Sequence, residues 1–194
     1  MPSHDHPEAE NLGWSLTSSQ MAYESKMVRL REDSLEVPGA GERKFAYMLR
    51  GAAVIIVPVT AEQEMILVRQ YRYPVDEFCY EVPAGTALDV KDKSLEEVAA
   101  KELKEEIGAT FQTLERIGSF YSNNAMMDEE CHVFLALGVK RPDAPQPEPM
   151  EKIEIHQMPI GKAMHLVRSG QMKTGPSALA VLLCETRLKE LGLA

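Results

Sequence analysis

The alternation of hydrophobic and polar residues predicts a chain whose first half is rich in strands. Over residues 14–37 short polar and apolar runs alternate up to the turn signal Pro38-Gly39-Ala40-Gly41, which indicates a hairpin or a small meander. Residues 45–60 and 65–73 contain apolar runs of strand length, and the connector between them is short enough for a hairpin. Further strands are predicted at 78–82, 118–121, 131–137 and 153–158.

Helical patterns follow or interrupt these strands, at 94–108, 160–169 and 177–191. The first predicted helix begins after Ser94, a preferred N-cap residue, and ends at Gly108. The proline-rich stretch 141–149 predicts an extended loop. Because strands come first and helices are inserted or appended, we expect an α+β fold, an α/β/α sandwich, and not a doubly wound parallel sheet.

Composition and charge narrow the class of protein. The 194 residues, 44% of them hydrophobic and 26% charged, are typical of one folded domain with a modest appendage. The net charge of −9 opposes binding of nucleic acid or an anionic membrane by bulk electrostatics, so neither partner is expected. An anionic substrate would therefore need local arginines or bound cations.

The cysteines and the N-terminal residues indicate a reducing, cytoplasmic setting. Cys79, Cys131 and Cys184 are widely spaced and form no CxxC pair, so they are predicted to be reduced core residues. The first residues are polar and acidic, without the basic and apolar regions of a signal peptide. No apolar run approaches the ~20 residues that a membrane span needs.

The predicted helix 94–108 combines an apolar stripe with a row of glutamates. The stripe consists of Leu95, Ala99, Leu103 and Ile107. Glu102, Glu105 and Glu106 lie at i, i+3 and i+4 and so share a face, with Glu102 and Glu106 at the rim of the stripe. Carboxylates crowded where hydration is poor repel one another unless a cation joins them, and oxygen ligands suit Mg²⁺, with Mn²⁺ as the alternative. The competing interpretation is a solvated acidic face with lysine pairs.

At residues 85–109 the sequence resembles the Nudix box, G-x5-E-x7-R-E-U-x-E-E-x-G-U, in which U is aliphatic. The end of this pattern is matched by Glu102-Leu103-Lys104-Glu105-Glu106-Ile107-Gly108. The flanking segments LVRQYRYPV, EVPAG and DEECHVFLALG resemble the branch that cleaves ADP-ribose and nucleoside-diphosphate sugars, and the resemblance covers residues 54–191. It implies a Nudix fold with a mixed β-sheet and an N-terminal hairpin or meander. The division that we expect is a disordered tail (1–12), N-terminal strands (13–50) and a catalytic domain (51–194).

Three departures from the Nudix pattern affect the box. Gly85 stands sixteen residues before Lys101, two more than the pattern has. Lys91 and Lys93 occupy the places where the first glutamate of the box is expected. Lys101 replaces an arginine that orients the box glutamates in the family, and lysine lacks its planar, two-pronged geometry. These changes leave the metal-binding positions intact and predict a turnover below the family norm.

The resemblance implies roles for the acidic residues of the site, position by position. Glu102 and Glu106, with the backbone carbonyl of Ala84, are implied as metal ligands, and Glu105 as a further ligand or an orienting residue. The general base is implied to lie in the proline-rich loop, which points to Glu151 or Glu148. For either residue taken singly, an ordinary loop acid is an equally good interpretation.

Substrate contacts are implied outside the box. Arg72 corresponds to a residue that contacts the diphosphate or ribose, and Glu129 to one that contacts the terminal ribose or sugar. Glu81 supports the metal cluster from a distance, or only pairs with a basic neighbour. Where many members have a glycine-rich turn, this chain has residues 122–127, which leaves the sugar preference open.

The same branch is typically homodimeric, and its N-terminal strands complete the partner's adenosine pocket. Candidates for such contacts are Trp14, Tyr23, Arg43, Lys44, Phe45 and Tyr47. The expected activity is metal-dependent hydrolysis of ADP-ribose or a related nucleoside-diphosphate sugar to a nucleoside monophosphate and a sugar phosphate. The alternatives are a Nudix hydrolase acting on a nucleoside triphosphate, a dinucleoside polyphosphate or coenzyme A, and a weakly catalytic module that senses ADP-ribose.

Overall fold

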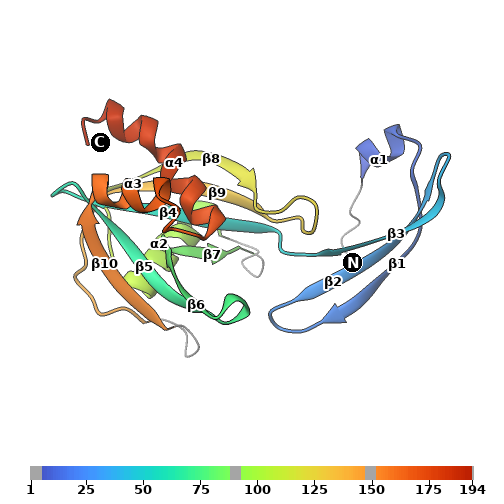
Figure 1. Ribbon diagram of the computed structural model, residues 1–194, viewed down its shortest axis with the longest axis horizontal. Coiled ribbons are helices and arrows are strands. Elements are labelled where there is room, and N and C mark those ends of the chain that lie inside the picture. The colour runs from blue at the N-terminus through green and yellow to red at the C-terminus, as the bar shows by residue number, and fades with distance from the viewer. Residues whose placement is uncertain (1–5, 88–92, 147–151, 194) are drawn as a thin grey trace. The chain divides into compact units, whose positions relative to one another are not determined.

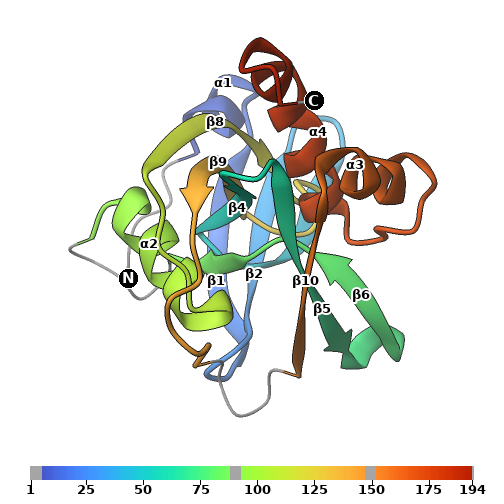
Figure 2. The same ribbon diagram turned by 90° about the vertical axis from the view of Figure 1, so that its left-hand side faces the viewer.

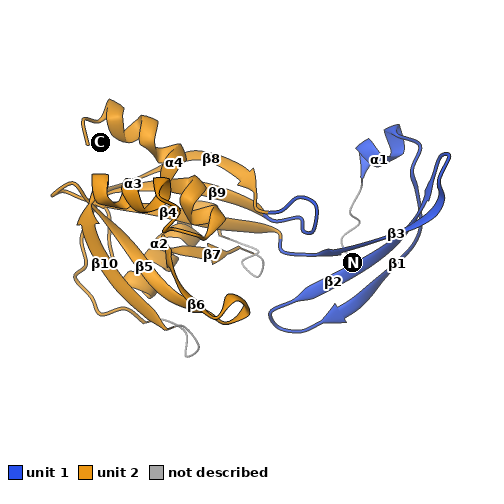
Figure 3. Cartoon of the chain, viewed as in Figure 1, with its two compact units in different colours: residues 1–50, 123–129 blue, residues 51–122, 130–194 orange. Residues whose placement is uncertain are grey.

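The computed structural model of the chain describes residues 6–87, 93–146 and 152–193 and divides into two compact units (Figures 1 and 3). Unit 1 comprises Met1–Arg50 and Asn123–Glu129, and unit 2 comprises Gly51–Ser122 and Glu130–Ala194. The main division along the chain falls between Arg50 and Gly51, and one later loop belongs to unit 1.

Unit 1 is built on a three-stranded antiparallel sheet in the order β1-β2-β3. Its strands are β1 (Ser15–Glu24), β2 (Arg29–Val37) and β3 (Gly41–Met48). The turn between β2 and β3 uses the predicted glycines, since Gly39 and Gly41 have φ of 76° and 69°, in the left-handed region. The expected N-terminal meander is thus confirmed.

Two stretches of unit 1 differ from the expectation. The short helix α1 (Pro7–Asn11) lies within the stretch that was expected to be a disordered tail, and its proline occupies the first turn, where no amide is needed. The single run predicted at 45–60 is two strands, because β3 ends at Met48 and the chain passes through Gly51, whose φ is 65°. A left-handed residue interrupts an extended strand, so the next strand begins a new sheet.

In the described part of unit 2 a seven-stranded sheet has the order β10-β5-β4-β9-β8, with β6 paired to β5 and β7 paired to β4. The strands are β4 (Ala52–Thr60), β5 (Glu64–Arg72), β6 (Glu77–Glu81), β7 (Ala84–Thr86), β8 (Thr113–Tyr121), β9 (Glu130–Val139) and β10 (Ile153–Pro159). A short 3₁₀ turn, η1 (Tyr73–Val75), follows β5. Strands β4 and β9 are parallel and the other pairs antiparallel, so the sheet is mixed.

Helices cover both faces of this sheet (Figure 2). α2 (Leu95–Ile107) covers one face, while α3 (Ile160–Arg168) and α4 (Gly175–Glu190) cover the other. Strand β4 is apolar from Ala52 to Val59 because it is buried on both sides: Val54 and Ile56 pack towards α2, and Val57 packs towards α3 and α4. The predicted α/β/α sandwich with a mixed sheet is confirmed.

Helix α2 begins and ends where the sequence predicts. The Ser94 hydroxyl accepts the Glu97 amide at 3.2 Å, and the Glu97 carboxylate accepts the Ser94 amide at 2.7 Å, which completes a capping box. Gly108 ends the helix with φ of 65°. Because both ends are capped and Leu103 is fully buried, the position of every glutamate along α2 is set by the helix itself.

The three cysteines are buried and form no disulfide, as expected. Burial raises the pKa of the Cys184 thiol to about 12, so this side chain is a neutral part of the core at physiological pH. None of the helices in the described residues is long and apolar enough to cross a membrane.

Candidate functional site

Strand β7 passes directly beneath the Glu102 side chain of α2. A Cβ atom built on Gly85 would lie 2.3 Å from Cδ of Glu102, well inside van der Waals contact. The carboxyl group of Glu102 therefore occupies space that any other residue at position 85 would take. Ala84, whose carbonyl is an implied metal ligand, is the neighbouring residue of the same strand.

The three box glutamates are not equally placed on α2. Glu106 is buried, with 7% of its surface exposed, and the Glu102 side chain is 16% exposed. The Glu105 side chain is 45% exposed. Glu102 and Glu106 thus lie towards the sheet, as the rim of the apolar stripe predicts, and Glu105 lies on the outer side of the helix.

Lys101 contacts two of these glutamates. Its Nζ lies 2.6 Å from Oε2 of Glu105 and 3.6 Å from Oε1 of Glu102. The hydrogen bond that Lys101 donates to Glu105, together with the negative charge of both carboxylates, raises the pKa of Lys101. The lysine therefore places a positive charge between two box glutamates, where the family pattern has an arginine.

Arg72 and Glu81 form a two-pronged ion pair beside the metal-ligand candidates. Arg72 Nε donates to Oε1 of Glu81 at 2.7 Å, and Nη2 donates to Oε2. Glu81 is only 3% exposed and also accepts the Thr174 hydroxyl, at 3.1 Å. The hydrogen bond with Glu81 raises the pKa of Arg72, and the negative charge of Glu106 adds to this effect, which indicates that the guanidinium lies near Glu106.

A pocket of about 400 Å³ opens beside this ion pair. It is lined by Arg72, Pro74, Val75, Glu77, Cys79, Glu81, Lys173 and Thr174. Lys173 Nζ contacts both carboxylate oxygens of Glu77, at 2.7 and 2.9 Å. Two positively charged side chains, Arg72 and Lys173, therefore line the pocket, and each is paired with a carboxylate. The Arg72 side chain is half-exposed.

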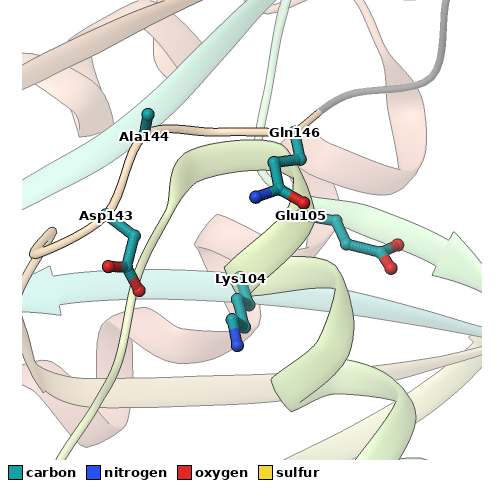
Figure 4. Close-up of a pocket in the computed structure, with 5 residues that line it drawn as sticks. All are labelled: Lys104, Glu105, Asp143, Ala144 and Gln146. Carbon is teal, nitrogen blue, oxygen red and sulfur yellow. The ribbon is translucent and has the colours of Figure 1, made fainter.

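On the outer side of α2 a second pocket, of about 530 Å³, lies between the helix and the start of the proline-rich loop (Figure 4). It is lined by Lys104, Glu105, Asp143, Ala144 and Gln146. Two hydrogen bonds tie the loop to the last turn of the helix: Arg141 Nε to the Ile107 carbonyl at 2.8 Å, and the Gln146 amide to the Glu105 carbonyl at 2.7 Å. These donors satisfy carbonyls that a helix end leaves unpaired.

The two candidates for the general base, Glu148 and Glu151, lie outside the described residues. The described residues on either side are both anchored next to the site. Gln146 is bonded to Glu105 on α2, and the Lys152 carbonyl accepts the amide of Tyr71, the neighbour of Arg72, at 3.4 Å. The described residues on both sides of Glu148 and Glu151 therefore lie close to Glu105 and to the neighbour of Arg72.

The remaining predicted contact residues belong to unit 1. Glu129 pairs with Nε of Arg50 at 3.2 Å, and Lys44 pairs with Glu32 at 2.9 Å. Trp14, Tyr23 and Phe45 are exposed, while Tyr47 is partly buried and donates to Asp33 at 3.1 Å. No contact described within unit 1 tests the roles predicted for Glu129 and Lys44, which stay predictions.

Thr174 is a site residue that sequence reasoning missed. Its only local signal is its place before Gly175 and Pro176, which predicts a helix N-cap and nothing about a carboxylate more than ninety residues earlier. The contact with Glu81 exists because the sheet brings β6 to the start of α4.

The donor set of α2 and β7 fits a hard divalent cation. Within residues 6–87, 93–146 and 152–193, no three His, Cys, Asp or Glu side chains gather closely enough to hold a metal ion by themselves. Two inward glutamates and a backbone carbonyl are nevertheless a set that suits Mg²⁺, which usually binds through one or two carboxylates and retains waters or substrate phosphates as its other ligands. Lys93 supplies no further oxygen ligand, and Lys91 lies outside the described residues.

Replacing Gly85 with alanine tests this geometry. The new Cβ would displace the end of the Glu102 side chain, which is flexible enough to move without unfolding the protein. We expect affinity for Mn²⁺, measured by calorimetric titration, to fall roughly tenfold, while the melting temperature stays near that of the wild type. Gly161→Ala is the matched control, because a Cβ there would meet no atom within 4 Å. Equal Mn²⁺ affinity in Gly85→Ala and wild type would contradict the assignment of Glu102.

Comparison with known proteins agrees with the geometry. The family model of the NUDIX domain matches residues 49–174. An ADP-ribose pyrophosphatase of Bacillus subtilis (strain 168) is 30% identical over 166 residues, 84% of this chain and 88% of its own. An ADP-ribose pyrophosphatase of Mycobacterium tuberculosis (strain ATCC 25618 / H37Rv) is 28% identical over 166 residues, 85% of this chain and 80% of its own.

The fold has a solved counterpart as well. A crystal structure of an ADP compounds hydrolase aligns with a TM-score of 0.80 at 21% identity, covering 93% of this chain and 97% of that one. The sequence likeness to relatives, the matched domain and this shared fold confirm the family predicted from residues 85–109: the chain belongs to the Nudix family.

Proposed function

We propose that the protein hydrolyses the pyrophosphate bond of ADP-ribose or a related nucleoside-diphosphate sugar, with the help of a divalent metal ion. The observation that carries the proposal is the arrangement of α2 over β7, where Glu102 lies against Gly85 and Glu106, four residues farther along the helix, is buried. The substrate class is supported by the names of two relatives, both ADP-ribose pyrophosphatases.

In this proposal Glu102, Glu106 and the Ala84 carbonyl would hold Mg²⁺, or Mn²⁺ in its place. Bound there, such an ion would offset the charge of the two phosphates, make water a stronger nucleophile and reduce the repulsion between a protein of net charge −9 and an anionic substrate. Lys101, bonded to Glu105, orients the outer glutamate of the box.

Arg72 supplies the fixed positive charge of the site. Its guanidinium is held by the buried Glu81 and remains half-exposed in the pocket, so it can still donate to a phosphate oxygen. Water adds to one phosphorus, the bond from phosphorus to the bridging oxygen breaks, and the products are a nucleoside monophosphate and a sugar phosphate. A base must take the proton of the water, and Glu151 or Glu148 is our candidate for it.

A substrate panel tests the activity. Purified protein with Mg²⁺ or Mn²⁺ is expected to release a nucleoside monophosphate from ADP-ribose, GDP-mannose or UDP-glucose, and not to act on NADH, coenzyme A or deoxynucleoside triphosphates at a comparable rate. Glu106→Gln should lower turnover at least 100-fold, since one metal ligand loses its charge. Glu96→Gln, an exposed glutamate in the first turn of the same helix, is the control.

Two outcomes of the panel would count against the proposal. Metal-dependent release from none of the diphosphate sugars would exclude the hydrolase activity proposed here, and binding of ADP-ribose without turnover would favour a sensing module. Full activity in Glu106→Gln would show that the metal assignment is wrong.

The general base is tested by comparing Glu148→Gln with Glu151→Gln. The variant that lacks the base is expected to lose at least 100-fold in kcat and to lose the rise of the rate with pH on the acidic side, because amides do not take up protons in this range. The other variant should keep both. Wild-type rates and pH profiles in both variants would show that neither glutamate of the proline-rich loop is the general base.

We further propose that unit 1 binds a second copy of the chain. None of the described hydrophobic residues of unit 1 is buried; the buried ones all lie in unit 2. Strand β1 is exposed along its whole length. Large apolar side chains are exposed at Leu12, Trp14, Leu16, Met21, Tyr23, Met27, Val28, Phe45 and Met126. A three-stranded sheet that buries no hydrophobic side chains is stable only when another surface packs against it. Exposed apolar patches of this kind mark interaction surfaces.

Analytical ultracentrifugation tests the dimer. The wild type is expected to sediment as a dimer, and the double variant Met21→Glu/Phe45→Glu as a monomer, because the pairing register places these two residues on one face of the sheet. Charged side chains there would be buried without a partner in the interface. A wild type that sediments as a monomer at micromolar concentration would refute the proposal.

A further inference from the structure

Thr174 occupies the N-cap of α4 but does not cap it. An N-cap hydroxyl ordinarily accepts the amide of the second or third helical residue. In α4 the second residue is Pro176, which has no amide hydrogen, and the Thr174 side chain makes no capping hydrogen bond. Its hydroxyl instead donates to Oε1 of Glu81, at 3.1 Å. The hydroxyl of Thr174 therefore bonds to a residue of the candidate site and not to the backbone of its own helix.

A second hydroxyl from the start of α4, that of Ser177, contacts Val82, the residue that follows Glu81. Ser177 is 2% exposed, and its Oγ accepts the amide of Val82 at 3.2 Å. The first turn of α4 thus holds Glu81 by its carboxylate and Val82 by its backbone. Farther along, the Pro83 carbonyl accepts the Ile56 amide at 2.9 Å, which fixes the chain just before Ala84.

The carboxylate of Glu81 depends on these donors because it is buried. Arg72 supplies two hydrogen bonds and Thr174 a third. Thr174 and Arg72 Nε both donate to Oε1, so loss of the Thr174 hydroxyl would leave Oε1 with a single donor and would remove one of the contacts that hold the buried carboxylate in its orientation. Since Arg72 is joined to Glu81 at both prongs, any turn of the carboxylate moves the guanidinium with it.

Arg72, Glu81 and Thr174 also line one pocket, of about 400 Å³, so these three hydrogen-bonded side chains border space that a ligand can enter. The negative charge of Glu106 contributes to the raised pKa of Arg72, so the guanidinium lies within electrostatic reach of this metal-ligand candidate. We infer that Thr174 is a positioning residue: through Glu81 it fixes the guanidinium of Arg72 in the direction of the substrate diphosphate. The inference rests on the proposed function.

Kinetics of Thr174→Val and Thr174→Ser test the inference. Valine keeps the shape and loses the hydroxyl, and serine restores it. We expect kcat/KM for the preferred diphosphate sugar to fall roughly tenfold in the valine variant and to return to within about twofold of the wild type in the serine variant. Thr186→Val, the same change at an exposed position of α4, is the control and should leave the rate unchanged.

A double-mutant cycle separates positioning from a general loss of structure. Lysine at position 72 lacks the fork that Glu81 holds, so Thr174→Val should cost no further activity in an Arg72→Lys background. If Thr174 acted only by stabilising α4, the same loss would appear in both backgrounds. Additive losses, or a valine variant with wild-type kcat/KM, would overturn the positioning role while the proposed function stands.

The failure of the proposed function has a different signature. A wild type that neither hydrolyses nor, in calorimetric titration, binds ADP-ribose or another diphosphate sugar would overturn both proposals. A wild type that binds ADP-ribose without turnover would overturn only the hydrolase activity. The cycle is then measured on the dissociation constant for ADP-ribose, where the same tenfold loss, absent in the Arg72→Lys background, is expected.

Discussion

The close approach of β7 to α2 at Gly85 is the contact on which the candidate site depends. A helix that packs on a sheet normally meets it through apolar side chains, and α2 does so through Leu103 and Ile107. At Gly85 the missing side chain leaves room for a carboxylate between helix and strand. A charged group is thereby held close to the protein core, a position that is costly without a cation and useful with one.

A second buried carboxylate, that of Glu81, is paired with a positively charged side chain of the protein itself. It is neutralised within the protein by the two-pronged bond to Arg72 and by a hydroxyl from α4. Such a pair is satisfied without any ligand, whereas Glu102 and Glu106 lie on the sheet-facing side of α2 with low exposure, where Lys101 contacts Glu102 at 3.6 Å. The two arrangements together place a fixed arginine near the carboxylates that we propose as metal ligands, which is what the proposed hydrolysis of a diphosphate would use.

Much of the fold could be predicted because its signals are local. Ser94 and Gly108 mark the ends of α2, and the apolar run of β4 marks a strand buried on both sides. The strand break at Gly51 was missed, since a single glycine between two β-rich runs does not reveal that they belong to different sheets. The spacing of Glu102 and Glu106 likewise predicted their inward direction, while the exposure of Glu105 depends on which side of α2 meets the sheet.

By itself the sequence determined the family, the helix that carries the glutamates and the glycine beside them, because these features lie within one continuous stretch of about twenty-five residues, 85–109. Only the tertiary structure decided that Glu81 pairs with Arg72 and that Thr174, more than ninety residues later, completes its shell of donors. The physical reason is that these contacts join separate strands and a helix across the fold. Their partners are selected by sheet register and helix packing, which leave no periodic trace in the sequence.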